Sequence, residues 1–268
     1  MTMTMSEQDF LKRIEAGEKI EANDPMPDEY RENLINLLEM QADSELSGAY
    51  GYIPWIEKAP NVHEKLLVAQ IVKDEVRHAY AIYKCLEELG IDIDKRVEEQ
   101  EFAYRLTDDA ANIGTQRAAQ DKRVNIFYYP IDTWIDFIMF NFCMDRGAGH
   151  QLEDAKESSY GPWGRAIQTI FKEEMMHVNH GDVWVAKLAN DPATREATQE
   201  ALNKWYNRTM NIFGRPGSRR NVIYQKWGLK KRDNDEVRQA YKAEIEEKLA
   251  SIPALTMPEW IPNYDENV

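Results

Sequence analysis

Two short motifs, about a hundred residues apart, constrain the fold of this chain more than any other feature. Residues 75–78 and 174–177 each read Glu-x-x-His, and both lie in segments whose apolar residues recur at helical spacing. Residues i and i+3 of a helix share one face, so the carboxylate and imidazole of each motif can approach the same metal ion. One such motif alone carries little weight, because a chain with five histidines contains about half a match by chance.

A carboxylate precedes each motif at nearly the same distance. Glu45 lies 30 residues before Glu75, and Asp145 lies 29 residues before Glu174. The chain therefore repeats one scheme, and four carboxylates with two histidines form the ligand set of a carboxylate-bridged di-iron site in a four-helix bundle. Oxygen-rich ligation with two imidazoles suits iron, or manganese, better than structural zinc. The predicted metal ligands are Glu45, Glu75, His78, Asp145, Glu174 and His177, with Glu75 and Glu174 as bridges.

The surroundings of these residues support the same interpretation. Asp145 follows the apolar segment 140–144, where an isolated buried carboxylate would be costly unless a cation offsets it. Taken singly, each of the six could instead be a solvated or salt-bridged side chain. Asp74 and Glu173 each precede a predicted ligand glutamate, and either could accept the second N–H of a ligand histidine from the opposite hairpin. Arg77 could pair with such a carboxylate or form a surface salt bridge.

The helical pattern predicts an all-α, ferritin-like four-helix bundle. Two pairs of long helices are separated by a connection of about 40 residues, which is the topology of a bundle with one long crossover. We expect one ferritin-like di-iron domain over residues 1–268, with a core bundle at about 28–190 and a C-terminal helical extension at about 191–268. Residues 1–27 read as an irregular lead-in. The helices are expected at 28–51, then, after breaks at Pro54 and Pro60, at 61–89, 131–157, 163–189, 193–213 and 234–251.

Charge and cysteine usage exclude several other classes of protein. The net charge of −14 repels phosphate backbones, so nucleic-acid binding is not expected. Cys85 and Cys143 show no metal or disulfide spacing and read as free thiols in a reducing compartment. We find no signal-peptide pattern and no run of about 20 apolar residues, and therefore expect a cytoplasmic protein without a membrane segment. We also find no flavin or nucleotide fingerprint and no cysteine set for an iron–sulfur cluster.

Two further features allow more than one interpretation. Gly147-Ala148-Gly149 follows Asp145, and small residues there either leave space for dioxygen and a substrate ring or allow close helix packing. His150 could approach the site from the third helix but is more simply a packed or surface histidine. His63 and His180 lack the Glu-x-x-His context altogether.

At this point the chain resembles a known family. The motifs resemble those of bacterial multicomponent monooxygenases and, more closely, the phenylacetic acid catabolism family of ferritin-like di-iron proteins, which includes the catalytic A subunits of ring 1,2-phenylacetyl-CoA epoxidases. The resemblance covers about residues 25–260. Asp43 and the long, charged segment 91–125 depart from the family pattern and leave the exact acyl-CoA open. The stretches that carry the resemblance are Ser44-Glu45, Asp74-Glu75 with His78, Asp145-Arg146-Gly147-Ala148, Ser159-Tyr160-Gly161-Pro162, Lys172-Glu173-Glu174 with His177, and 234–239.

The resemblance implies a di-iron, dioxygen-activating monooxygenase component that epoxidises the aromatic ring of an acyl-CoA such as phenylacetyl-CoA. Electrons would come from a separate NADPH-dependent reductase, and the further partners would be a small coupling subunit together with a helical sister subunit. Glu45, Glu75, Asp145 and Glu174 would be the catalytic carboxylates. The alternatives are another ferritin-like di-iron or manganese oxidase or catalase, or a non-catalytic ferritin-like scaffold subunit.

Basic residues are clustered near the end of this acidic chain. Arg219, Arg220 and Lys230 could bind the phosphates of coenzyme A, because guanidinium groups match phosphate geometry well. A solvated loop or a surface for an anionic partner is the alternative.

Overall fold

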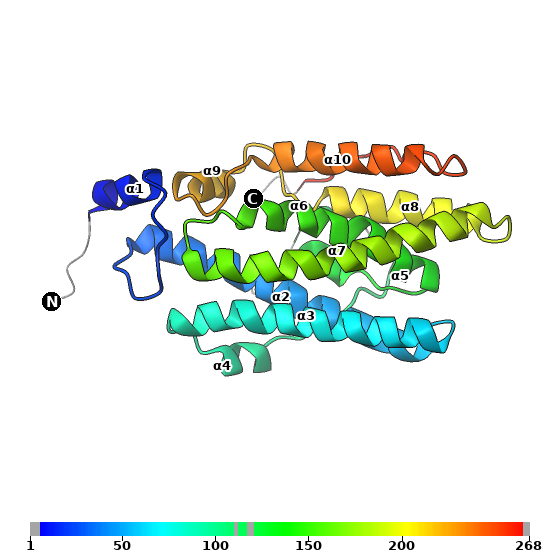
Figure 1. The fold of residues 1–268 in the computed structure, drawn as a ribbon, viewed down its shortest axis with the longest axis horizontal. Coiled ribbons are helices and arrows are strands. Elements are labelled where there is room, and N and C mark those ends of the chain that lie inside the picture. Colours follow the sequence, from blue (N-terminus) through cyan, green and yellow to red (C-terminus); the bar gives the residue numbers. More distant parts are fainter. Residues whose placement is uncertain (1–5, 110–111, 117–120, 265–268) are drawn as a thin grey trace.

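The computed structural model describes residues 6–109, 112–116 and 121–264, and these residues are helical with irregular connections (Figure 1). Within these ranges no β-strand forms, and a single bridge joins Ile20 to Tyr160. The predicted all-α class is therefore confirmed. None of the helices in these ranges is both long and apolar enough to cross a membrane.

Four long helical rods form the bundle. The first hairpin consists of α2 (Asp28–Lys58) and α3 (Val62–Glu88), which pack along each other. The second pairs α7 (Gly161–Asn190) with a rod made of α5 (Trp134–Phe140), the π-helical turn η2 (Asn141–Asp145) and α6 (Arg146–Ala155). The crossover between the hairpins contains α4 (Ile93–Glu98) and the 3₁₀ turn η1 (Asn125–Tyr128). This is the predicted ferritin-like bundle with one long crossover.

Further helices flank the bundle. They are α1 (Glu7–Glu15), α8 (Arg195–Met210), α9 (Arg219–Lys226) and α10 (Asn234–Ala250). The prediction of an irregular lead-in is wrong for α1, where Ser6 caps the helix. The helix forms because Phe10 is fully buried, with its ring 4.7 Å from that of Tyr30 and 5.8 Å from that of Trp227. The short helix α9 was not predicted either, because its sequence is mostly polar.

Two predicted helix ends are wrong, and one predicted cap is confirmed. Helix α2 does not break at Pro54 but continues to Lys58, since Tyr52 and Trp55 on this last part are buried in the core and offset the hydrogen bond that proline cannot make. The third rod begins at Trp134 rather than 131, where Thr133 and Asp136 form a capping box. The predicted Asn61 cap of α3 is present, with its side chain accepting from the Glu64 N–H.

The polar site lies between two apolar clusters. One cluster includes Tyr52, Ile71 and Val185, and the other includes Leu38, Ala79 and Ile170. On each of the four rods the predicted ligands fall, in sequence, between members of the two clusters. The bundle thus places its carboxylates at mid-length, with apolar packing at either end.

Candidate metal centre

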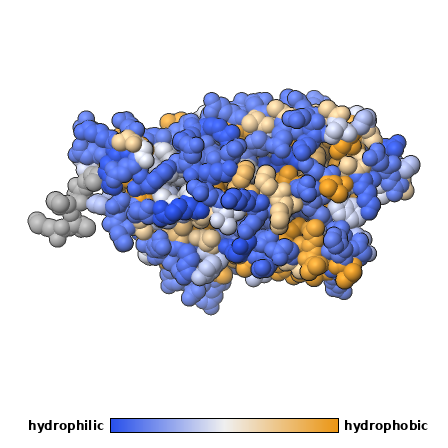
Figure 2. All heavy atoms as spheres, in the orientation of Figure 1, coloured by the Kyte–Doolittle hydropathy of each residue, from blue (hydrophilic) through white to orange (hydrophobic). Residues whose placement is uncertain are grey.

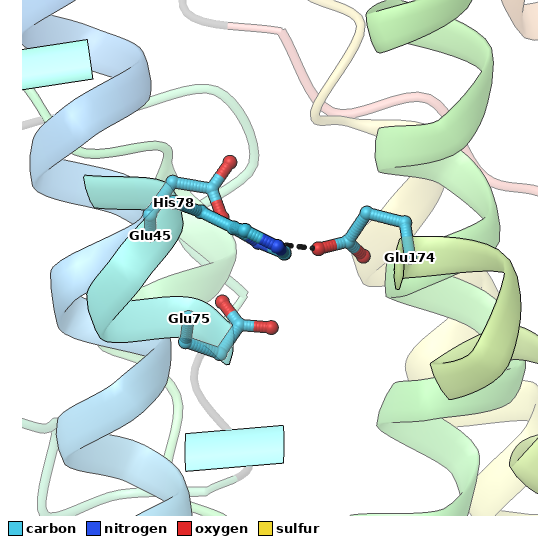
Figure 3. Close-up of side chains that lie close together, drawn as sticks. All are labelled: Glu45, Glu75, His78 and Glu174. Atoms are coloured by element: carbon cyan, nitrogen blue, oxygen red, sulfur yellow. Dashed lines mark ion pairs between the residues drawn. The ribbon is translucent and has the colours of Figure 1, made fainter. Parts of the chain in front are cut away.

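The structure brings together all six predicted ligands. Each is buried, with no more than 6% of its surface exposed. Their ligand atoms form two groups that share Glu174, and within each group these atoms lie within 4.8 Å of one another. Figure 3 shows Glu45, Glu75 and His78 of the first hairpin facing Glu174 of α7. The first group is Glu45, Glu75, His78 and Glu174, and the second is Asp145, Glu174 and His177.

Two glutamates lie between the two imidazoles. Glu174 Oε1 is 3.1 Å from Nδ1 of His78, and its Oε2 is 3.6 Å from Nδ1 of His177. Glu75 Oε1 is 3.4 Å from Nδ1 of His177, and Glu45 Oε2 is 3.5 Å from Nδ1 of His78. The histidine ring centroids are 6.2 Å apart. Glu75 and Glu174 therefore occupy the positions from which a carboxylate can contact both half-sites.

Charged side chains on the outer side of the histidines fix their orientation. Nε2–H of His78 donates to Glu173 Oε2 at 2.9 Å, across the two hairpins as predicted. Asp74 lies 3.8 Å from Nε2 of His177, which is too long for a hydrogen bond. Arg77 pairs with Glu173 at 2.5 Å and with Asp74 at 3.0 Å, so it joins the carboxylates behind both imidazoles.

The pKa values of the site follow from burial and mutual charge. Burial, reinforced by the charge of Glu174, raises the pKa of Asp145 to about 7 and that of Glu75 well above its ordinary value. Burial also opposes ionisation of Glu174, but His177 and His78 hold its pKa at about 2. Burial works against the charged form of His78, yet Glu174 and Glu45 raise its pKa to about 11. The buried carboxylates thus favour positive charge among them, which either protons on the imidazoles or bound cations can supply.

The donor atoms fit a metal ion. Nδ1 of His78 and Nδ1 of His177 both face carboxylates and, among the described residues, have no well-aligned hydrogen-bond partner. A buried imidazole nitrogen beside several carboxylate oxygens is a ligand set for iron or manganese. The two groups, each with one histidine, can hold two ions that share Glu174.

The comparisons with known proteins agree with this geometry. The sequence matches the family described as Phenylacetic acid catabolic protein over residues 3–267, which is nearly the whole chain. The chain belongs to this family. It is 29% identical over 245 residues to the A subunit of 1,2-phenylacetyl-CoA epoxidase from Escherichia coli K12, an alignment that covers 89% of this chain and 73% of that protein. It is 26% identical over 231 residues to benzoyl-CoA oxygenase component B from Aromatoleum evansii, covering 79% of this chain but only 47% of that protein.

The family confirms the resemblance predicted from the motifs. Both relatives are named as an epoxidase or an oxygenase, so the chain is similar to oxygenases. Both names also describe one part of a larger enzyme, since the first protein is an A subunit, whereas the second is a component B.

A small cavity opens beside the carboxylates. Its volume is about 30 Å³, and its walls include Phe127, Phe140 and Ile212 beside Glu45 and Asp145. Ala148 and Gln151 of α6 also line it. Gly147 instead packs against Thr209 and Ile212 of the neighbouring segment. Close packing at Gly147 agrees with one of the two interpretations of the Gly-Ala-Gly stretch, and Ala148 contributes to the cavity wall, while space for dioxygen or a substrate ring stays a prediction.

The remaining sequence candidates lie away from the carboxylates. His150 does not join the site, because its Nε2 is 2.7 Å from Glu244 of α10. Arg219 and Arg220 are exposed at the start of α9. Lys230 lines a second, smaller pocket, and Gln151 lines both this pocket and the carboxylate cavity.

Sequence reasoning missed several polar residues that support the site. Tyr52 and Asn141 donate hydrogen bonds to Asp145, and Gln41 donates to Glu45 at 2.6 Å. Gly48 faces Glu75, since a Cβ there would lie 3.0 Å from Glu75 Oε2. The role of Gln41 could have been predicted from the sequence, because Gln41 precedes Glu45 by one helical turn. The part played by Tyr52 depends on how the two hairpins pack, which local spacing does not reveal.

Proposed function

We propose that this chain is the metal-bearing component of a di-iron oxygenase. The observation that carries the proposal is the pair of buried donor groups that share Glu174 and contain one histidine each. The proposed ligands are Glu45, Glu75, His78, Asp145, Glu174 and His177, and the proposed ions are iron, with manganese as the alternative. When bound, a carboxylate-bridged iron pair supplies dioxygen activation with electrons from outside the chain.

The side chains of the site would have different roles in binding the two ions. Glu75 and Glu174 lie between the histidines and would contact both ions, whereas Glu45 and Asp145 each belong to one half. Glu173 holds the His78 ring through its outer nitrogen, which keeps Nδ1 directed at the carboxylates. The apolar walls formed by Phe127, Phe140 and Ile212 would exclude water from the reacting ring.

We propose an acyl-CoA with an aromatic ring, such as phenylacetyl-CoA, as the substrate. The names of both relatives support this class, since one contains phenylacetyl-CoA and the other benzoyl-CoA. A dry cavity that admits benzene measures about 150 Å³. The cavity here is about 30 Å³, so side chains at its mouth would have to move to admit the ring.

The coenzyme A part of the substrate would remain outside the cavity. Gln151 lines both the carboxylate cavity and the pocket that Lys230 and Arg232 line, so a ring bound in the cavity would have basic side chains near its thioester chain. We propose that Lys230, together with Arg219 and Arg220 on α9, contacts the phosphates.

Electrons and partner subunits would come from other proteins. We propose an NADPH-dependent reductase, a small coupling subunit, plus a helical sister subunit, in keeping with the relatives' names as parts of larger enzymes. Apolar side chains gather at the surface near the start of α3 (Figure 2). Val62 and Leu66 of α3 and Val183 of α7 are exposed by 82%, 71% and 61%, and exposed apolar patches of this kind mark protein interfaces.

Metal analysis tests the first part of the proposal. Anaerobic titration of the apo-protein with Fe²⁺ should saturate at about two ions per chain. His78→Ala and His177→Ala should each remove roughly half or more of the bound iron, because each histidine is the only imidazole of its group. His150→Ala is the matched control, since His150 pairs with Glu244 and should leave occupancy unchanged. Saturation at zero ions, or full occupancy in either ligand variant, would contradict the assignment.

Turnover tests the second part. The purified, chemically reduced chain should oxidise phenylacetyl-CoA at most once, and sustained turnover with NADPH should require an added reductase and a further subunit. Repeated turnover by this chain alone with NADPH would contradict the dependence on partners. Rapid disproportionation of hydrogen peroxide, with no ring oxidation, would support a catalase-like enzyme instead.

A further inference from the structure

Both oxygens of the Asp145 carboxylate are held by donors from two different elements. The Tyr52 hydroxyl of α2 donates to Oδ1 at 3.1 Å, and Nδ2 of Asn141 donates to Oδ2 at 2.9 Å. Asn141 begins the π-helical turn that Asp145 ends. Tyr52, Asn141 and Asp145 are all at least 96% buried, so water does not compete for these contacts.

The Asn141 amide is itself fixed by a buried histidine outside the metal centre. Its Oδ1 lies 3.1 Å from Nδ1 of His180 on α7, and Nε2 of His180 lies 2.9 Å from Glu64 Oε2 on α3. Glu64 and His180 are each only 7% exposed. A hydrogen-bonded chain therefore runs from Glu64 through His180 and Asn141 to Asp145, and it links three of the four rods.

The chain has a defined direction at the amide. Asn141 must present its N–H to Asp145, because a carboxylate only accepts, so its oxygen must accept from His180. Nδ1 of His180 therefore carries a hydrogen. This arrangement requires Glu64 either to pair with a charged imidazole or to donate from a protonated carboxyl to Nε2. In both cases Glu64 holds Nε2 of His180, which leaves the Nδ1–H directed at Asn141.

Close packing holds His180 in this position. A Cβ at the adjacent Gly181 would lie 2.6 Å from the backbone nitrogen of Phe142, so α7 approaches the π-helical turn more closely than any larger residue permits. Trp134 and Phe137 place their rings 6.3 Å from the imidazole, at steep angles to it.

The other terminal carboxylate is held differently. Glu45 accepts from Gln41, a partly exposed residue of the same helix that lines the cavity. Asp145 thus has two buried donors, whereas Glu45 has one donor on a partly exposed side chain. This difference makes the two half-sites unequal.

We propose that Glu64, His180 and Asn141 are positioning residues for Asp145, and that they make the Asp145–His177 half-site the tighter of the two metal sites. This inference rests on the proposed function, because it requires that the centre bind two ions.

Titration of the apo-protein with Co²⁺, followed by its visible absorption spectrum, tests the inference. The wild type should bind two ions in two distinguishable steps. Asn141→Leu, which removes the donor to Asp145, should weaken the tighter step by about 10–100-fold and change its spectrum, the usual effect of losing an outer hydrogen bond to a metal ligand. Gln41→Leu is the matched control and should alter the weaker step instead.

A pair of substitutions at Glu64 separates positioning from mere packing. Glu64→Leu should weaken the tighter step, because the imidazole then loses the partner that fixes its Nδ1–H. Glu64→Gln should restore it, since an amide N–H can donate to Nε2 and leave the hydrogen on Nδ1. Should Asn141→Leu fail to fold, the two Glu64 variants still decide the question, with apo-protein melting temperatures as the check on folding.

The outcomes distinguish this inference from the proposed function. A wild type that binds no ion contradicts both. Two ions with an unchanged tighter step in Asn141→Leu and Glu64→Leu contradict the inference alone and leave the di-iron proposal standing. Loss of the tighter step in Gln41→Leu would mean that the half-sites are assigned the wrong way round.

Discussion

Arg96 of α4 pairs with Asp43 of α2, two residues before Glu45. The guanidinium contacts both carboxylate oxygens, at 2.5 and 3.2 Å, and the Tyr83 hydroxyl donates to the same carboxylate at 2.9 Å. Asp43 is completely buried. The contact connects the two departures from the family pattern, because the charge at position 43 is balanced by a residue of the charged segment 91–125.

Removing this guanidinium should destabilise the fold. Arg96→Met leaves Asp43 buried without its partner, and the loss of one member of a buried ion pair typically costs about 3–5 kcal/mol. Urea denaturation of the apo-protein measures the effect. The double variant Asp43→Asn with Arg96→Met should recover part of the loss, because position 43 is then uncharged, whereas Glu39 still loses its ion pair with Arg96.

An exposed ion pair provides the comparison for Arg96. Arg165 pairs with Glu21 at 2.8 Å, but both side chains are about half exposed. Arg165→Met should therefore cost less than about 1 kcal/mol. Equal losses for Arg96→Met and Arg165→Met would show that burial of Asp43 does not set the energy of its pair.

The carboxylate behind His78 should matter for metal affinity although it is not a proposed ligand. Glu173→Leu removes the acceptor of the His78 Nε2–H and one of the two carboxylate partners of Arg77. Loss of such a contact typically lowers metal affinity about 10–100-fold. Competition with a chromophoric chelator measures this change, and Lys172→Leu, at an exposed neighbouring position, is the control. An affinity equal to that of the wild type would mean that packing alone orients the ring.

The stability contributed by Glu244 should depend on pH in a defined direction. Its pKa is lowered from 4.5 to about 2, first by the hydrogen bond with His150 and then, against the effect of burial, by Arg146. A lowered pKa means that the contribution is complete above about pH 4.5 and disappears as the pH falls towards 2. Glu244→Gln should therefore be less stable than the wild type near neutral pH, and the difference should shrink in acid.

Chemical denaturation at several pH values tests the role of Glu244. Glu247→Gln, at an exposed position on the same helix, is the control and should show no such trend. A Glu244→Gln deficit that stays constant from about pH 6 to about pH 3 would contradict the linkage.

Much of the fold could be predicted from the sequence because the signals were local. The Glu-x-x-His spacing placed the residues on helices, and Asn61 and Gly90 marked the ends of one of them. Helix α1 was overlooked although Phe10, Leu11 and Ile14 follow helical spacing, because the turn at residues 23–27 dominated the interpretation of that segment. The single-domain organisation stays a prediction, which an apolar cluster running from Tyr52 to Leu255 supports.

The parts of the site that could not be predicted depend on tertiary packing. Nothing in local spacing links His180 to Asn141, 39 residues earlier, or to Glu64, 116 residues earlier. The π-helical turn that ends at Asp145 also has no local sequence signal. Asn141 and Asp145, four residues apart, are equally compatible with an ordinary α-helix. The proposed ligands were found by their repeated spacing, and Glu173 by its place beside one of them, whereas the residues that hold Asp145 were not.

Neutralising the basic residues near α9 should weaken coenzyme A binding. Lys230 lines the pocket that shares Gln151 with the carboxylate cavity, whereas Arg219 and Arg220 are exposed on α9. If all three contact phosphate, Lys230→Met and the double variant Arg219→Met with Arg220→Met should each weaken binding of a CoA ester by about 1–3 kcal/mol. Equilibrium dialysis with phenylacetyl-CoA measures this change.

Neutralising Lys231, a nearby lysine, is the control for the binding measurement. Lys231 lies one residue from Lys230 but pairs with Glu157, so Lys231→Met changes the net charge equally without removing a proposed phosphate contact. Equal weakening by Lys230→Met and Lys231→Met would indicate general electrostatic attraction, which salt screens. An unchanged affinity in the double arginine variant, with a clear loss in Lys230→Met, would restrict the phosphate site to the pocket beside Gln151 and leave α9 as a surface for an anionic partner.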